Sequence, residues 1–177
     1  MNKQLTLTSR DEIEKYIELL KYSAEEAQFK LDEVSSHSYP LHLLEKIKFE
    51  KIGFDPLDST RSINLIEQAN QTFTYLASFL AAEILFSKHQ GLKHLVMNLG
   101  TQAGSDLESQ FNGGIAAEVF SSVSPNNNDK LRKDIIKVER TEAKHKYVFF
   151  LCPEIEAGPY KNPLANEVHV FALSGDY

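Results

Sequence analysis

The turn at residues 112–114, Asn-Gly-Gly, constrains the fold of this chain more than any other feature of its sequence. Asn and Gly readily adopt the positive φ angles of a tight hairpin turn, and the runs on either side are short and alternating. The turn therefore predicts two neighbouring antiparallel strands, one ending near residue 110 and one beginning near residue 115.

The predicted hairpin places acidic side chains on two adjacent strands. Because strand side chains alternate with a period of two, Asp106 and Glu108 share a face of the first strand, and Ala116 and Glu118 share a face of the second. For a loop of two to four residues, Asp106 comes within about two positions of the residue opposite Glu118, which corresponds to roughly 7–8 Å between Cα atoms.

Two carboxylates at that separation can bind one hard cation. Mg²⁺ takes oxygen ligands and keeps several waters, so Asp106, Glu118 and a substrate phosphate would suffice, and Mn²⁺ accepts the same ligands. The alternative is that both acids are solvated on an exposed face of the sheet. Apolar neighbours of Glu118 count against this alternative, since a buried charge is costly unless it is paired or coordinated.

Amide side chains recur along the first half of a long helix predicted from about residue 62 to residue 88, with N-cap candidates at residues 58–60. Asn64, Gln68 and Gln71 form one stripe, where surface helices usually carry Lys and Glu. The stripe predicts hydrogen bonds to a specific target such as a substrate, although bracing of a neighbouring loop explains it equally well. Residues 73–82 carry no charge, so we expect this half to be the buried central helix.

A second helix is predicted near the start of the chain, because Ser9 followed by Glu12 is a capping box. Its apolar residues alternate in steps of four and three between Ile13 and Val34. A seam of this kind predicts either a homodimer contact through the heptad helix 13–34 or a helix packed on its own domain. Residues 41–54 are ambiguous between helix and strand. Further strands are expected at 95–99, 147–152 and 167–173, and a helix at 129–140.

Composition narrows the function classes. The 177 residues are 42% hydrophobic and carry a formal net charge of −6, so a globular fold is expected and there is no global basic field to attract nucleic acid. Cys152 is the single cysteine, which excludes an internal disulfide and a cysteine-based zinc site. With no apolar run of about 18 residues and no signal-peptide pattern, we expect a cytoplasmic protein without a membrane partner.

The order helix, three strands with acids on the second and third, helix, strand resembles the core of the PD-(D/E)XK nuclease superfamily. The resemblance covers residues 62–152 and is carried by a pattern of few residues. It implies an α/β fold in which a central mixed β-sheet is flanked by helices, a restriction-endonuclease-like core of order αβββαβ. Residues 58–177 would form this core, and residues 1–57 an N-terminal helical extension that packs on the core or on a partner. Mg²⁺-dependent cleavage of phosphodiester bonds in DNA is the implied activity.

By this resemblance, Asp106 is similar to the metal-binding acid of the second strand and Glu118 to the first acid of the terminal tripeptide. Glu67 is similar to an accessory metal-binding acid on the first core helix. Two positions depart from the family pattern: no Pro precedes Asp106, and Phe120 stands where the family has Lys.

A lysine from the next helix would have to replace the missing one, as happens elsewhere in the superfamily. Lys130 is the expected catalytic lysine because it opens that helix. Lys133 is the second choice, and is otherwise expected to contact substrate together with the amide stripe.

Three functions compete at this point. The leading hypothesis is a Mg²⁺- or Mn²⁺-dependent nuclease. The second is a catalytically inactive nuclease-like module that binds nucleic acid or a protein partner, favoured by Phe120 and the acidic composition. The third is an interaction protein that docks through the heptad helix.

Overall fold

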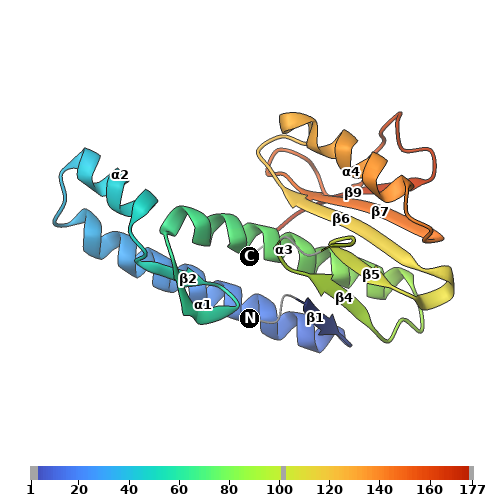
Figure 1. Ribbon diagram of the computed structural model, residues 1–177, viewed down its shortest axis with the longest axis horizontal. Helices are drawn as coiled ribbons and strands as arrows, with labels where there is room; N and C mark the ends of the chain where they lie inside the picture. The colour runs from blue at the N-terminus through green and yellow to red at the C-terminus, as the bar shows by residue number, and fades with distance from the viewer. Residues whose placement is uncertain (1–3, 101–102, 176–177) are drawn as a thin grey trace. The chain divides into compact units, whose positions relative to one another are not determined.

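The computed structural model describes residues 4–100 and 103–175. Over these residues the protein is α/β, with a seven-stranded mixed sheet, a two-stranded sheet and four α-helices (Figure 1). It divides into two compact units, here called the helical unit (residues 14–76) and the sheet unit (residues 4–13 and 77–175). The mixed-sheet α/β class is confirmed. The division differs from the expected boundary between 1–57 and 58–177, because the chain changes unit after residue 13 and again after residue 76.

The sheet unit is built on strands in the order β1-β4-β5-β6-β7-β9-β8. Their bounds are β1 (Gln4–Leu7), β4 (Leu95–Asn98), β5 (Leu107–Ser109), β6 (Ile115–Ser121), β7 (His145–Leu151), β8 (Gly158–Pro159) and β9 (Val168–Leu173). The pairs from β1 to β6 are antiparallel, β7 is parallel to β6, and β9 is parallel to β7. A short 3₁₀ turn, η1 (Phe111–Gly113), follows β5. A second one, η2 (Asn127–Asp129), lies between β6 and the next helix.

Helix α4 (Lys130–Glu139) covers one face of the sheet at β6 and β7 (Figure 1). Its apolar positions Leu131, Ile135 and Val138 are buried against alternate residues of the strands, among them Phe120 and Phe150. The expected helix at 129–140 and the expected strand at 147–152 are thus confirmed to within two residues. This layer forms the core beneath the acids of β5 and β6.

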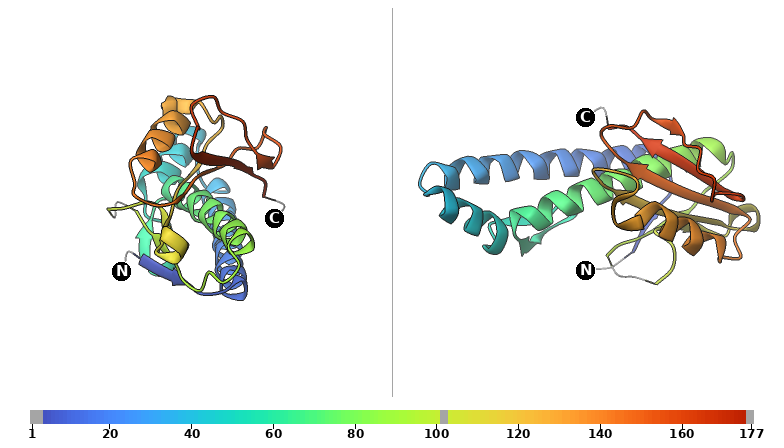
Figure 2. Two further views of the ribbon diagram at one scale, coloured as in Figure 1. Left: turned by 90° about the vertical axis from the view of Figure 1, so that its right-hand side faces the viewer. Right: turned by 90° about the horizontal axis from the view of Figure 1, so that it is seen from above.

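The opposite face of the sheet meets the end of helix α3 (Leu65–Lys88) (Figure 2). The ring of Phe171 on β9 lies 4.7 Å from the Lys88 ammonium, and Tyr147 on β7 is hydrogen-bonded to His89 at 2.9 Å. Because strand residues alternate between faces, these aromatic residues point away from α4. The sheet is therefore packed on both sides.

An edge strand, β1, was not expected from the sequence. It pairs antiparallel with β4, so that Gln4 lies opposite Asn98 and Leu7 opposite Leu95. Leu7 is fully buried, and the Gln4 side chain donates to Asn98 Oδ1 at 2.8 Å. Four residues near the N-terminus therefore belong to the sheet rather than to a helical extension.

The helical unit contains most of α1 (Arg10–Ser35), α2 (Pro40–Phe49), the hairpin of β2 (Gly53–Asp55) and β3 (Asp58–Ile63), and the first half of α3. The ambiguous run 41–54 is thus a helix followed by a strand. Residues 58–63 form a strand rather than the expected helix start. Asn64 supplies the N-terminal cap of α3, because its Oδ1 accepts the Glu67 N–H at 2.8 Å.

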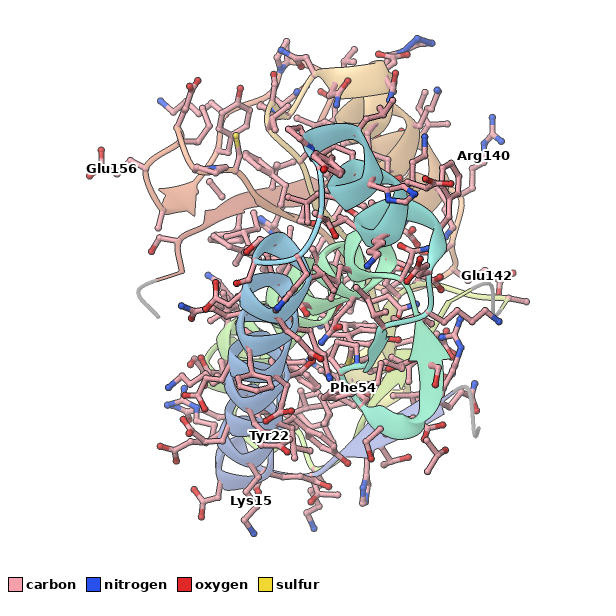
Figure 3. The ribbon with its side chains drawn as sticks, turned by 90° about the vertical axis from the view of Figure 1, so that its left-hand side faces the viewer. Lys15, Tyr22, Phe54, Arg140, Glu142 and Glu156 are labelled. Atoms are coloured by element: carbon pink, nitrogen blue, oxygen red, sulfur yellow. The ribbon has the colours of Figure 1, made fainter. Side chains whose placement is uncertain are left out.

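Apolar side chains remain exposed on α1 and α2. Of the heptad positions, Ile13 and Leu20 are buried, whereas Leu31 is 39% exposed. Tyr22, labelled on α1 in Figure 3, is 54% exposed. No side chain of α2 is buried. The N-terminal part of the seam is thus already covered by the chain itself.

Candidate functional site

The turn after β5 brings the two predicted acids face to face. Asn112 and Gly113 have positive φ angles of 49° and 90°, as the sequence predicts, and they reverse the chain into β6. Leu107 pairs with Ala117 in the antiparallel register of β5 and β6. One further step along this register places Asp106 opposite Glu118.

Asp106, just before β5, is tied to the next strand through its side chain. Its Oδ2 accepts the backbone N–H of Val119 at 2.7 Å, and its carbonyl accepts the N–H of Asn98 at 2.9 Å. These two bonds hold Asp106 between β4 and β6. The carboxylate is thereby fixed beside the position that Glu118 occupies.

Glu118 is a buried carboxylate, with only 1% of the residue exposed. Its Oε2 accepts a hydrogen bond from Lys137 Nζ at 2.6 Å, and its Oε1 has no partner. Burial raises the pKa of Glu118 to about 7, and the nearby charges of Asp106 and Asp134 act in the same direction, whereas Lys137 opposes the rise. Whether Glu118 is ionised therefore depends on the charges of Lys137, Asp106 and Asp134 around it.

Asp134 on α4 is a third acid in the same cluster. It is 3% exposed, its Oδ1 accepts from Lys130 Nζ at 2.7 Å, and its Oδ2 has no partner. Burial raises its pKa, and the charge of Asp106 adds to this rise, while Lys130 and Lys137 oppose it. Asp106, Glu118 and Asp134 are thus coupled through their charges.

The structure corrects the choice of lysine. Lys137, rather than Lys130, reaches Glu118 from α4. Lys130 pairs with Asp134 and lies 5.8 Å from the centre of the Phe120 ring, and Lys133 donates to the backbone carbonyl of Asn128. The reason is helical geometry, since seven residues are nearly two turns and carry Lys137 along the same face as Lys130 toward the other end of the helix.

Sequence reasoning missed Lys137 and Asp134 as site residues, although a signal was present. Asp134 falls beside the core positions Leu131, Ile135 and Val138 of α4, which marks it as a buried acid. A charge on the apolar face of a helix requires a partner, and Lys137 lies one turn further along that face.

A cavity of about 670 Å³ opens beside the ion pair. Lys137 lines it, together with Ser105, Glu108, Ala116 and Thr141. Glu108 lies on the same strand face as Asp106, and one of its oxygens is 3.3 Å from the Asn98 amide. The cavity offers a ligand access to Lys137 and to the acidic face of β5.

The amide stripe lies in the helical unit, where Gln68 and Asn64 form hydrogen bonds within the chain. Gln68 is 1% exposed; its Nε2 donates to Ser23 Oγ at 2.8 Å and to the Ser23 carbonyl at 2.9 Å, and its Oε1 accepts from Phe54 N–H at 3.2 Å. Asn64 is the cap described above. These bonds give both ends of the Gln68 amide and the Asn64 oxygen a structural role, and substrate binding by the stripe stays a prediction.

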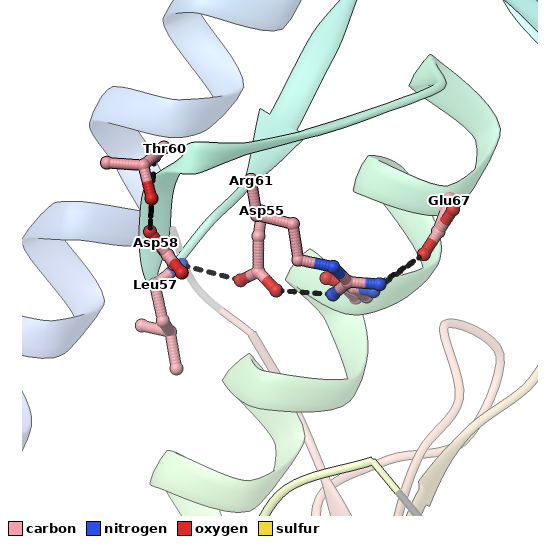
Figure 4. Close-up of polar contacts among 7 residues, drawn as sticks. Asp55, Leu57, Asp58, Thr60, Arg61 and Glu67 are labelled. Carbon is pink, nitrogen blue, oxygen red and sulfur yellow. Dashed lines mark hydrogen bonds and ion pairs between the residues drawn. The ribbon is translucent and has the colours of Figure 1, made fainter. Parts of the chain in front are cut away.

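Arg61 joins Asp55 and Glu67 in a polar network (Figure 4), which Gln71 extends through Glu67. Arg61 donates to Glu67 Oε1 at 3.0 Å and to the fully buried carboxylate of Asp55 at 2.7 Å. Gln71 Nε2 donates to the same Glu67 oxygen at 3.1 Å. The carboxylate of Glu67, expected as an accessory metal ligand, is thus neutralised by an arginine within the helical unit.

Across residues 4–100 and 103–175, no group of three or more His, Cys, Asp or Glu side chains is placed so that it could hold a metal ion. The expected set of Asp106, Glu118 and Glu67 is therefore not such a group. Two buried oxygens, Glu118 Oε1 and Asp134 Oδ2, nevertheless have no hydrogen-bond partner. Buried carboxylate oxygens are normally satisfied by a hydrogen bond, so these two are exceptions among the described residues.

None of the helices in the described residues is long and apolar enough to span a membrane. The chain matches no protein-family model, no curated protein and no solved structure.

Proposed function

We propose that this chain is a metal-dependent nuclease that hydrolyses phosphodiester bonds in DNA, built on a restriction-endonuclease-like core. The order of elements supports the proposal. Helix α3 precedes the antiparallel strands β4, β5 and β6, which are followed by α4 and by β7 parallel to β6. This is the αβββαβ order that the sequence resemblance implies, with Asp106 beside the second strand and Glu118 on the third.

The observation that carries the proposal is the ion pair between Lys137 and Glu118. Phe120, at the position where the superfamily has its lysine, is buried and stacked on Phe150 with ring centres 5.8 Å apart. Lys137 instead brings an ammonium group from α4 to the acid, with Nζ 2.6 Å from Glu118 Oε2. An acid pair with a lysine is thus assembled despite the missing motif residue.

Asp106 and Glu118 are the residues that would hold Mg²⁺ or Mn²⁺. The bound ion would supply a water of lowered pKa and a polarised scissile phosphate. Lys137 would keep Glu118 in place, orient the attacking water and stabilise the negative charge that develops on the phosphate. The Lys137 side chain is 51% exposed and lines the cavity, so it can contact a phosphate that enters from solvent.

Plasmid nicking in Mg²⁺ or Mn²⁺ tests the proposal. We expect the wild type to nick, and Asp106→Asn and Lys137→Met to lose activity by about a hundredfold or more, as for other groups that stabilise a transition state. Arg132→Met is the matched control from the same helix, because Arg132 is half exposed and pairs with the exposed Asp129. If the wild type leaves duplex and single-stranded DNA intact with both ions, the nuclease proposal fails.

The second candidate is an inactive module of the same fold that binds nucleic acid or a protein. Each of the two lysines already neutralises one buried acid, as Lys137–Glu118 and Lys130–Asp134, and ion pairs with a purely structural role would have the same arrangement. A mobility-shift assay in EDTA distinguishes the candidates. If the protein shifts a DNA duplex in this assay but never cleaves it in Mg²⁺ or Mn²⁺, the result would favour the inactive module.

A further inference from the structure

We infer that two copies of this chain associate through their helical units, so that α2 of one copy docks on the outward face of α1 of the other. The surface lies within residues 22–48, and none of it belongs to the sheet unit that carries the proposed nuclease site. The inference is therefore independent of the proposed function. It also differs from the heptad seam, which lies on the other side of α1.

The first support is the exposure of α2, a helix of ten residues without a buried side chain. Leu41 and Leu44 are three residues apart and so lie on one side of the helix, where they are 80% and 62% exposed. Lys48 continues this side one turn further along. An isolated helix of this length is marginal in water, and neighbouring exposed apolar side chains are typical of interaction sites.

The second support is the outward face of α1, which is formed by Tyr22 and Phe29. These two residues are seven positions, or nearly two turns, apart, and both are more than half exposed (Figure 3 labels Tyr22). The buried seam residue Leu20 is two positions from Tyr22, about 200° around the helix. The chain therefore covers the seam side of α1 and leaves two aromatic side chains of the opposite side in solvent.

The third support is charge complementarity, which favours a second copy as the occupant. Helix α1 contains eight acidic and four basic residues, whereas α2 contains one acidic and two basic residues. Glu25 and Glu26 lie between the two exposed aromatic residues of α1. Among the described residues these acids form no ion pair, and neither do Lys46 and Lys48 of α2.

The two surfaces therefore match each other better than either matches itself. Acids beside the apolar face of α1 would meet lysines beside the apolar face of α2, whereas two outward faces of α1 would bring acids against acids. Each copy carries both surfaces, so the contact can form twice and close into a two-fold dimer. A contact between single helices is at the small end of specific interfaces, and we expect an equilibrium between monomer and dimer.

Sedimentation velocity of the full chain over a range of concentrations tests the inference. We expect Leu44→Glu to weaken the dimer about tenfold or more, since an apolar side chain at the centre of an interface contributes at least that much. Leu164→Glu is the matched control, because Leu164 is also half exposed but lies in the sheet unit. Circular dichroism verifies that both variants keep their helices.

Charge reversal tests the pairing of α1 with α2. Glu25→Lys with Glu26→Lys, and Lys46→Glu with Lys48→Glu, should each weaken the dimer about tenfold, although they shift the net charge in opposite directions. The chain that carries all four changes keeps the formal net charge of −6 and should regain the dimer. If this chain stays monomeric, α1 and α2 do not face each other and the inference fails.

Two further outcomes would overturn the inference. A wild type that sediments as one chain at every concentration excludes a second copy, and binding of that monomer to anionic lipid vesicles would assign the face of α2 to a membrane surface. A dimer that is lost in Leu31→Glu but kept in Leu44→Glu would assign the contact to the heptad seam.

Discussion

The charge on Glu118 changes in the neutral pH range because burial raises the pKa of its carboxyl from 4.5 to about 7. In the folded protein the proton is held more tightly than in the unfolded chain. The protonated Glu118 carboxyl therefore stabilises the folded state. Its contribution is complete below about pH 4.5 and is lost as the pH rises to about 7.

Glu118→Gln should therefore gain stability relative to the wild type as the pH rises. The gain should reach roughly 3 kcal/mol between pH 4.5 and pH 7.5 and level off above, since one pKa unit corresponds to about 1.4 kcal/mol. Chemical denaturation in EDTA at a series of pH values measures it. A difference that stays constant across this range would contradict the prediction.

Lys137→Met should destabilise the protein only where Glu118 is ionised. We expect a loss of about 1–2 kcal/mol at pH 8, less than for a fully buried pair, because the lysine is half exposed and Glu118 can take up a proton instead. At pH 5 the loss should nearly vanish. Equal losses at both pH values would show that the methylene chain of Lys137, rather than its charge, contributes to stability.

Helix α3 shows how an element can carry a pattern for structural reasons. Gln68 joins α1 to β2 by bonding Ser23 and Phe54, and Gly53 on β2 leaves the space that its amide needs. A Cβ at position 53 would lie 2.1 Å from Gln68 Oε1. The amide and the glycine therefore form one structural contact.

Gln68→Leu should lower the free energy of unfolding by about 1–3 kcal/mol, since Ser23 Oγ and the Phe54 N–H lose their partner. Gly53→Ala should have a similar effect because it displaces the same amide. Neither change should alter Mn²⁺ affinity or cleavage, because no residue of this contact belongs to the proposed site. A selective loss of DNA binding in Gln68→Leu would support the substrate-contact interpretation.

These elements also show how far the sequence predicts the structure. Apolar periodicity and turn residues predicted α4, β7, β9 and the β5–β6 turn, because local preferences and burial agree there. Residues 58–63 were misassigned because Asp, Ser and Thr cap helices but also accept turn and strand roles. For the site, the sequence predicted the two facing acids but not Lys137, since which lysine reaches Glu118 depends on how α4 lies on the sheet.

At the scale of the whole molecule, the chain passes from one unit to the other after residue 13, near the start of α1, and after residue 76, in the middle of α3. Removal of residues 1–34 should therefore destabilise the sheet unit, because β1 and the buried side chains of Leu7 and Ile13 are lost. Hydrogen exchange should show faster exchange of the β4 amides. Deletion of residues 1–3, which leaves β1 intact, is the control, and unchanged β4 exchange in the longer deletion would contradict the prediction.

The homodimer through residues 13–34 stays a prediction. Leu31 is a seam position that remains 39% exposed, so Leu31→Glu should reduce the mass measured by light scattering if the seam joins two copies. Leu19→Glu is the matched control, since Leu19 is also exposed on α1 but lies off the seam. A wild type with the mass of one chain would contradict the dimer.

The pairing of β1 with β4 has a consequence for synthesis on the ribosome. Gln4 and Asn98 are 94 residues apart, so β1 is translated long before the strand with which it pairs. Contacts so distant in sequence slow folding and leave strand edges open to association with other chains in the meantime. Nascent chains that stall before residue 95 should therefore depend more on chaperones than the finished protein does.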